Sequence, residues 1–276
     1  NAIVWQDRRT TDRCQELIKQ GCLSEIRSKT GLVLDPYFSA SKFEWMIKSS
    51  LVDSSKKFCL GTIDSWLIWK LTDGQVHATE PSNASRTMLF NLKSSVWEAE
   101  LCDIFSIPTV ALPEIRTTSG HFGTTVEDGP LPAGIPISGM AGDQQASAIG
   151  QACFKKGDTK STYGTGCFLL MNIGGKFHLS KNKLLTTVAY KIGNQKMYCY
   201  EGSIFVAGSA IQWLRDKLFL FKDSKETEYL YSKANKNENI MVVPALTGLG
   251  APHWEPNARG AIFGLTRNTS IAEIVK

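Results

Sequence analysis

The sequence predicts an α/β fold built from two domains. Segments with helical spacing of apolar residues dominate the first half of the chain. After Gly157, segments rich in β-branched and aromatic residues alternate with helical ones. Strands that alternate with helices are typical of α/β architecture. The change of character near 153–160 predicts a boundary between a first domain, 1–153, and a second, 154–276.

Three helices are expected early in the chain. The segment 10–20 has helical spacing and ends before Gly21, and 39–49 has Ser39 as its expected N-cap. The segment 62–71 predicts a strongly apolar helix that ends at the turn formed by Asp73 and Gly74.

A strand, a glycine turn and a helix are expected around residue 140. PISGMAGDQQ, at 136–145, predicts a buried strand that ends at a glycine turn, and 144–154 predicts a helix of small residues. A Pro/Gly-rich loop at 127–136 precedes them.

The second half predicts hairpins and further helices. Gly174-Gly175 and Gly193-Asn194 have the chemistry of hairpin turns. The remaining expected elements are helices at 203–218 and 224–234 and core strands at 240–246 and 260–265.

Both ends of the sequence read as interrupted elements. NAIVW, at 1–5, predicts a buried strand already under way, and the last residues predict the first turns of a helix capped by Thr269 or Ser270. The sequence has no initiator Met, so we expect a fragment cut at both ends.

Composition argues against several functional classes. The net charge of +5 comes from interleaved cations and anions, which indicates a solvated surface rather than a nucleic-acid footprint. No apolar run approaches ~18 residues, so no membrane-spanning helix is expected. The seven cysteines form no CxxC pair, which favours reduced thiols in a cytoplasmic protein.

Asp143 and Gln144 follow the expected strand at the glycine turn of Gly142. Ligands in α/β folds usually bind at the carboxyl ends of strands, so Asp143 could take a proton from a hydroxyl or help hold Mg²⁺. The alternative is that Asp143 is simply the N-cap of the helix, the commonest reason for Asp at such a place.

Two glycine-containing motifs could bind a nucleotide. In STYGTGCF, at 161–168, glycines flank Thr165, so backbone amides and a hydroxyl could face a phosphate. An ordinary hairpin is the alternative. AGSAIQW, at 207–213, leaves room for a flat ligand or, as the more frequent explanation, for another helix.

Three aromatic side chains could pack on the C–H face of a polyol, although core burial is the better explanation for any single one of them. They are Trp5, Tyr37 and Phe168.

Taken in their order along the chain, the segments named below resemble the FGGY family of carbohydrate kinases. The resemblance covers nearly the whole chain. The segment 37–49 is similar to the first family signature, and 260–276 is similar to the start of the second. The other similar segments include AIVWQDRRT, GTIDSWLIWKLT, SNASRTMLFN, PISGMAGDQQ, STYGTGCFLLMN and EGSIFVAGSAIQWLRD.

The resemblance implies two actin- and ribonuclease-H-like domains, truncated at both ends, with an active site in the cleft between them. It implies ATP-dependent phosphorylation of glycerol to sn-glycerol 3-phosphate. Asp143 matches the catalytic base and lies near Mg²⁺, directly or through water. Tyr37, Asp143 and Gln144 match positions that bind glycerol hydroxyls, and Trp5 and Phe168 match the apolar walls.

On the nucleotide side, the resemblance implies that Thr165 contacts phosphate between Gly164 and Gly166, and that Gly208 and Gln212 line the nucleotide site. The family's N-terminal phosphate-binding hairpin, its polyol-gripping Arg-Glu pair and its adenine-binding segment lie outside 1–276. We therefore expect this fragment alone to be inactive. The loop 124–136 also lacks the pattern with which bacterial members bind a sugar bisphosphate inhibitor.

Two alternatives remain open at this stage. One is a family member that phosphorylates another small sugar or polyol, such as a pentulose. The other is a non-catalytic nucleotide-binding relative. Trp5 and the segment 35–39 favour the small triol over a larger sugar, and Asp143 argues against a non-catalytic relative. A homo-oligomer is compatible with each of these interpretations.

Overall fold

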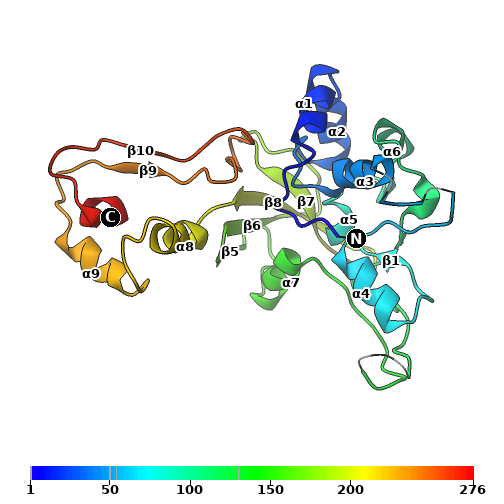
Figure 1. The fold of residues 1–276 in the computed structure, drawn as a ribbon. Coiled ribbons are helices and arrows are strands. Elements are labelled where there is room, and N and C mark those ends of the chain that lie inside the picture. Colours follow the sequence, from blue (N-terminus) through cyan, green and yellow to red (C-terminus); the bar gives the residue numbers. More distant parts are fainter. Residues whose placement is uncertain (1, 50, 54, 128, 130) are drawn as a thin grey trace. The chain divides into compact units, whose positions relative to one another are not determined.

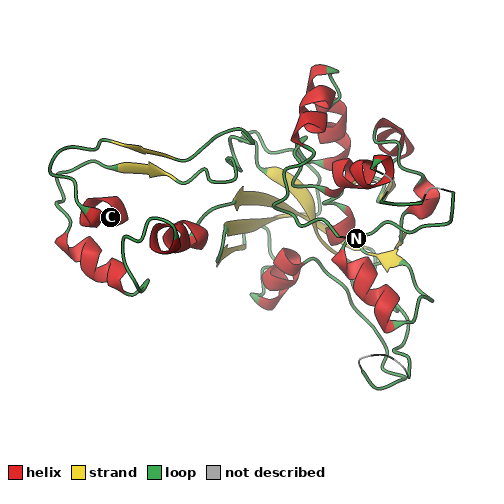
Figure 2. Ribbon diagram, in the orientation of Figure 1, coloured by secondary structure: helices red, strands yellow, loops and turns green. Residues whose placement is uncertain are grey.

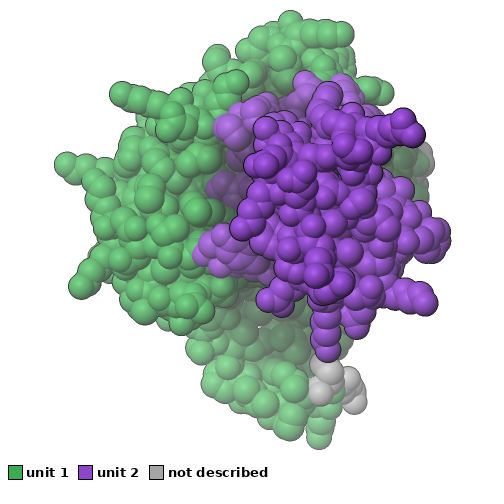
Figure 3. All heavy atoms as spheres, turned by 90° about the vertical axis from the view of Figure 1, so that its left-hand side faces the viewer, with its two compact units in different colours: residues 1–160, 169–201 green, residues 161–168, 202–276 purple. Residues whose placement is uncertain are grey.

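The computed structural model describes residues 2–49, 51–53, 55–127, 129 and 131–276. They form two compact units, which Figure 3 shows in different colours. Unit 1 comprises residues 1–160 and 169–201, and unit 2 comprises residues 161–168 and 202–276. Helices and strands occur in both units (Figures 1 and 2), which confirms the predicted α/β class.

The helices of unit 1 include the three that were predicted early in the chain. The predicted helices correspond to α1 (Thr11–Lys19), α3 (Ser39–Lys48) and α4 (Ile63–Leu71). The others are α2 (Leu23–Thr30), α5 (Pro81–Ala84), α6 (Ala99–Ile104), the 3₁₀ helix η1 (Thr109–Ala111) and α7 (Asp143–Gly150).

Some local details of these helices differ from prediction. Phe38, not Ser39, is the N-cap of α3. The apolar α4 is not a core helix on all sides, because Ile63, Trp66 and Leu67 are exposed. The predicted turn after α4 is confirmed, since Asp73 and Gly74 both have positive φ.

Unit 1 and unit 2 share a four-stranded sheet with the strand order β5-β6-β8-β7. Its strands are β5 (Thr159–Tyr163), β6 (Cys167–Gly174), β7 (Leu185–Ile192) and β8 (Gln195–Ile204). The first six residues of β7 are all buried, as expected for a strand covered on both faces. Two short pairs accompany this sheet, namely parallel β1 (Ala78–Thr79) with β4 (Glu114–Ile115) and antiparallel β2 (Phe90–Asn91) with β3 (Val96–Trp97).

The sheet confirms one predicted hairpin and contradicts the other. Gly193 and Asn194 connect the antiparallel strands β7 and β8, and Gly193 has a φ of 55°. The hairpin predicted at Gly174-Gly175 is wrong, because β8 lies between β6 and β7 in the sheet. Ten residues, 175–184, make this connection, which is long enough to pass beyond the neighbouring strand.

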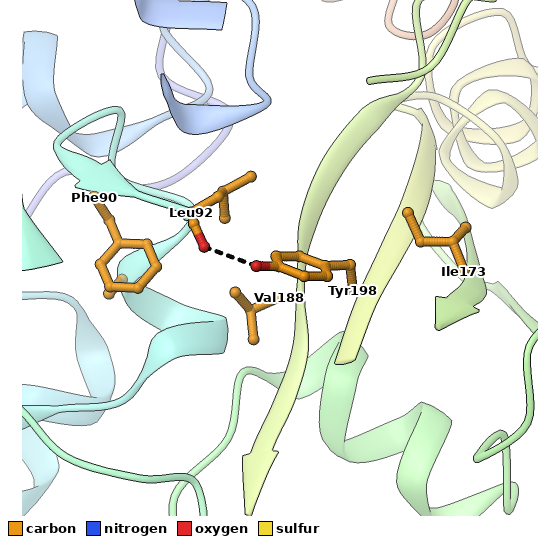
Figure 4. Close-up of a cluster of buried hydrophobic side chains, with 6 residues drawn as sticks. Phe90, Leu92, Ile173, Val188 and Tyr198 are labelled. Carbon is orange, nitrogen blue, oxygen red and sulfur yellow. Dashed lines mark hydrogen bonds between the residues drawn. The ribbon is translucent and has the colours of Figure 1, made fainter. Parts of the chain in front are cut away.

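Two buried clusters fix the sheet against the helices of unit 1. Tyr198 packs with Phe90, Leu92 and Val188, and its hydroxyl donates to the Leu92 carbonyl at 3.0 Å (Figure 4). The second cluster joins α7 to the sheet and contains Ala148, Cys153, Leu170, Ala189, Tyr190 and Cys199. The C-terminal half of α7 is therefore packed against the sheet.

Unit 2 contains α8 (Gly208–Asp216), α9 (Glu226–Lys233), α10 (Ile271–Val275) and the antiparallel pair β9 (Met241–Val243) and β10 (Ala261–Phe263). The predicted cap of the last helix is confirmed, because the Ser270 side chain accepts from the Ala272 amide. Ser270 and Glu273 also form a reciprocal capping box.

Several extended segments were wrongly predicted as core strands. Residues 2–4 form no strand, and Val4 is exposed, while Asn1 lies outside the described residues. The segment 136–139 makes only isolated pairs with residues 119 and 124 and is mostly exposed. Residues 128 and 130 of the Pro/Gly-rich loop lie outside the described residues.

The later strands and helix are also shorter or less buried than predicted. β9 and β10 exist, but Met241 and Phe263 are exposed, so the pair is not a core element. The helix expected from 203 begins at Gly208, because residues up to 204 continue β8. Within the described ranges, no helix is long and apolar enough to cross a membrane.

Candidate active site

Asp143 stands at the first position of α7, with its carboxylate exposed. The N-cap is Gly142, so the interpretation of Asp143 as an ordinary N-cap is wrong. Its two carboxylate oxygens accept from the Gln144 backbone amide at 2.8 Å and from the Gln144 side-chain amide at 3.1 Å. A carboxylate in the first turn is also favoured by the helix dipole. The carboxylate is thus oriented and still accessible.

Gln144 connects Asp143 to a buried cation that was not singled out from the sequence. Lys160, at the start of β5, donates from Nζ to Gln144 Oε1, and Lys160 is only 4% exposed. Burial lowers the pKa of Lys160, and the negative charges of Asp143 and Glu201 oppose that shift. The Gln144 amide is therefore held between a carboxylate and an ammonium group.

The backbone before Asp143 is held by a buried hydroxyl. The Gly142 amide donates to Ser82 Oγ at 2.9 Å, and the Ser82 hydroxyl donates in turn to Glu80 Oε1. Glu80 is fully buried and also accepts from the Ser82 and Asn83 amides at 3.0 and 2.8 Å. This series of hydrogen bonds fixes the position from which α7 begins.

Trp5 and Tyr37 lie together, as the polyol interpretation requires. Their ring centroids are 5.5 Å apart in an edge-to-face arrangement. The Tyr37 amide donates to Asp35 at 2.8 Å, and Asp35 is held by a bidentate pair with Arg8. Trp5 is 37% exposed.

The backbone of Trp5 is held by an unusual lysine. The Lys42 ammonium donates to the Trp5 carbonyl at 3.3 Å, and Lys42 is 5% exposed. Burial lowers the pKa of Lys42 to about 8, and the charge of Asp7 opposes this shift.

An ion pair that the sequence analysis missed lies beside Tyr37. The Arg86 guanidinium carbon is 4.9 Å from the centre of the Tyr37 ring, and Nη1 pairs with Glu201 Oε2. Burial disfavours the Arg86 cation, but the charges of Glu201, Tyr37 and Asp143 outweigh it and raise the pKa. Arg86 and Glu201 are 115 residues apart in sequence, so no local pattern could reveal this pair.

The two glycine motifs of unit 2 come together. The turn 164–166 connects β5 to β6, and its carbonyls accept from the first residues of α8. The Gly208 amide donates to the Gly164 oxygen at 2.9 Å, and the Ser209 amide and hydroxyl donate to the Thr165 oxygen at 3.2 and 2.9 Å. Thr165 itself is exposed at the tip of the turn.

Close approach explains why glycine occurs at two of these positions. A Cβ on Gly208 would lie 2.6 Å from the Gly164 oxygen, and a Cβ on Gly166 would lie 2.5 Å from the Ile204 oxygen. The half-buried Phe168 ring covers Gly166 from the side, at 3.1 Å from that same Cβ position. Gln212 follows one turn after Gly208 on α8 and is exposed.

The predicted site residues thus fall into two groups. Trp5, Tyr37, Asp143 and Gln144 belong to unit 1, whereas Phe168 and the nucleotide-side residues Gly164, Thr165, Gly166, Gly208 and Gln212 belong to unit 2. Unit 1 thus contains an oriented carboxylate and amide at the start of α7 and a paired Trp5 and Tyr37, which are the kinds of group that suit a polyhydroxylated ligand.

A metal ion at this site would need oxygen ligands from the protein, from water or from a substrate. The described residues contain no group of three or more His, Cys, Asp or Glu side chains that could hold a metal ion by themselves. Mg²⁺ commonly binds through one or two carboxylates, waters and substrate phosphates, so the exposed Asp143 carboxylate fits a single protein contribution to such an ion.

Comparison with protein families gives two matches that together cover most of the chain. Residues 1–150 match the N-terminal domain of the FGGY family of carbohydrate kinases, and residues 159–276 match its C-terminal domain. The chain therefore belongs to the FGGY family of carbohydrate kinases.

Among individual proteins, the chain is similar in sequence to glycerol kinases. It is 52% identical over 280 residues to the glycerol kinase of Alcanivorax borkumensis and 51% identical over 281 residues to that of a Marinomonas strain. These alignments cover 99% and 100% of the chain. In both cases the chain spans 56% of the relative's length.

Solved structures agree on the fold. The structure of Plasmodium falciparum glycerol kinase with ADP superposes with a TM-score of 0.85 and 39% identity, covering 100% of this chain and 56% of that one. A xylulose kinase from Lactobacillus acidophilus superposes with a TM-score of 0.81 over the same shares of the two chains. Because its identity is 23%, that likeness shows the fold alone.

Proposed function

We propose that the protein containing this chain transfers the γ-phosphoryl group of ATP to glycerol, giving ADP and sn-glycerol 3-phosphate. The observation that carries the proposal is about 50% identity along the whole chain to glycerol kinases of several bacteria. The site geometry supports it, since an exposed, oriented carboxylate lies in the same unit as a paired Trp5 and Tyr37.

Asp143 acts as the general base in this proposal. Its carboxylate accepts the proton of a primary hydroxyl as that oxygen forms a bond to the γ-phosphorus. The bond from the γ-phosphorus to the β,γ-bridging oxygen breaks, and ADP leaves with the electron pair. Mg²⁺, bound to the ATP phosphates and near Asp143, would offset their charge. Phosphoryl transfer depends mainly on such positioning and charge neutralisation.

The other predicted residues bind the two substrates. Tyr37 and Gln144 donate or accept hydrogen bonds with glycerol hydroxyls, and Trp5 and Phe168 contact its carbon chain. Thr165, in the turn between Gly164 and Gly166, contacts phosphate. Gly208 and Gln212 line the nucleotide site. The domain boundary near 153 and 154, a cytoplasmic location and a homo-oligomeric state stay predictions.

The first test is ADP release by the full-length protein with Mg-ATP and a panel of acceptors, namely glycerol, dihydroxyacetone, xylulose, ribulose and gluconate. We expect glycerol to be the best acceptor. In Asp143→Asn, kcat should fall at least ~100-fold, because the base is lost while the fold is kept. The matched control is Asp103→Asn, an exposed aspartate in α6, which should retain full activity.

Other outcomes would change the proposal in defined ways. Turnover of a pentulose but not of glycerol would keep the family and overturn the substrate. ATP binding without turnover of any acceptor would favour a non-catalytic relative.

A further inference from the structure

Glu201, near the end of β8, has a buried carboxylate that links Arg86 to Gln145. It is 2% exposed, and both of its oxygens are occupied. Oε2 pairs with Arg86, and Oε1 accepts from Gln145 Nε2 at 2.9 Å and from the Thr187 hydroxyl. A buried carboxylate with this many donors is held in one orientation, because each lost bond would leave a buried polar group unpaired.

One branch leads from Glu201 to the aromatic wall. The Arg86 guanidinium lies between its ion pair and the rings of Tyr37 and Phe38, at 4.9 and 5.6 Å from their centres. A planar guanidinium stacks on an aromatic face and is weakly hydrated, which suits this half-buried place. The orientation of the guanidinium, and with it the contact to Tyr37, is therefore set by Glu201.

The second branch leads to α7. Gln145 is 1% exposed and follows Asp143 and Gln144 directly in the first turn of the helix. Its side-chain amide donates to Glu201, so the first turn is attached to β8. A rotation of the first turn would move Asp143 and Gln144 together, and the Gln145 hydrogen bond opposes that rotation.

We propose that Glu201 is a positioning residue for phosphoryl transfer, which fixes Tyr37 through Arg86 and fixes Asp143 and Gln144 through Gln145. The inference rests on the proposed function for the identity of the reaction. It adds a residue that contacts neither the nucleotide nor the polyol but sets the distance between the base and the polyol-binding ring. The Arg86 branch and the Gln145 branch both end on the Glu201 carboxylate. A shift in one branch therefore changes the interactions that hold the other.

The test uses the full-length protein with Glu201→Gln, Arg86→Met and the double variant. Glu201→Gln keeps a neutral acceptor for Gln145 and Thr187 but leaves the Arg86 cation without its counter-charge. We expect kcat/KM for the polyol to fall by about tenfold or more, with little change in KM for ATP. The double variant removes both charges, so the melting temperature should return toward that of the parent protein. Its kcat/KM should stay low, because the orientation of Tyr37 is not restored.

A matched control separates positioning from general stability. Glu44 on α3 has a 2% exposed side chain that pairs with Arg13 and Lys48, away from α7. Glu44→Gln should lower the melting temperature comparably while kcat/KM stays within about twofold of the parent value. Full activity in a folded Glu201→Gln protein, or recovery of activity along with stability in the double variant, would show that the pair only supports the fold.

A second measurement does not depend on turnover. Hydrogen–deuterium exchange should become faster over 143–150 and 37–48 in Glu201→Gln, and not at 143–150 in Glu44→Gln. Unchanged exchange in both segments would overturn the inference. If the parent protein released no ADP with any polyol, the proposed function would fail, and the exchange data would still decide whether Glu201 fixes the two segments.

Discussion

The backbone amide of Gly142 donates a buried 2.9 Å hydrogen bond to the hydroxyl of Ser82, sixty residues earlier in the chain. Gly142 immediately precedes Asp143, so this hydrogen bond fixes the backbone at the residue from which α7 starts. The candidate base is thus positioned from α5 as well as from the sheet.

Removing that hydroxyl should affect stability and catalysis together. Ser82→Ala leaves a buried amide without an acceptor, which costs about 1–3 kcal/mol of the free energy of unfolding. We also expect kcat to fall while KM for ATP is kept. Urea unfolding and steady-state kinetics on the full-length protein check both effects. Ser28→Ala, at an exposed serine in α2, should change the free energy of unfolding by no more than about 0.5 kcal/mol.

The close contact at the start of α8 allows a second prediction. In Gly208→Ala the new Cβ would lie 2.6 Å from the Gly164 oxygen, so the helix or the turn must move. We expect a loss of about 1–3 kcal/mol in stability and a higher KM for ATP. Gly150→Ala is the control, because a Cβ there meets nothing within 4 Å. An unchanged KM for ATP in Gly208→Ala would argue against a nucleotide site at this turn.

Lys160 offers a test of how Gln144 is oriented. In Lys160→Met the Gln144 oxygen loses its buried ammonium donor. A lost hydrogen bond of about 1 kcal/mol predicts a rise of about fivefold in KM for the polyol, with a smaller change in kcat. Lys155→Met, at an exposed lysine, provides the baseline. Equal polyol kinetics in the two variants would remove Lys160 from the site.

The lowered pKa of Lys42 predicts that the free energy of unfolding varies with pH in the alkaline range. Burial lowers its pKa from 10.5 to about 8, so between these values the unfolded chain binds more protons than the folded one. The free energy of unfolding should therefore rise with pH across this window, relative to Lys42→Met, by up to about 3 kcal/mol. Urea midpoints from pH 7 to 10 check this, with exposed Lys19→Met as control. Parallel pH profiles for the parent and Lys42→Met proteins would contradict it.

Local chemistry predicted some turns and caps correctly, although the N-cap expected at Ser39 was wrong. The capping role of Ser270 and the turn at Gly193-Asn194 were predictable because hydrogen bonds to neighbouring amides, or a positive φ, decide them. Gly174-Gly175 has similar turn chemistry, but the strand that pairs with β6 is chosen by contacts far along the chain. The prediction there failed for that reason.

The candidate site shows the same division. Asp143, Gln144 and the Gly-Thr-Gly turn occur in short recognisable motifs, and the structure joins the turn to the start of α8. Arg86, Lys160 and Glu201 are single charged residues in unremarkable surroundings, and their significance comes only from burial and pairing. A sequence without structural contacts cannot separate such residues from solvated ones.

The chain passes between the two compact units three times, after residues 160, 168 and 201. Neither unit is therefore encoded by one uninterrupted stretch of the gene. A chimaera that exchanges unit 2 with that of a relative must transplant two pieces, 161–168 together with 202–276. A single crossover placed anywhere in 167–201 would combine the turn 164–166 of one parent with the α8 helix of the other. Such recombinants would show how much the contact between Gly164 and Gly208 differs among relatives.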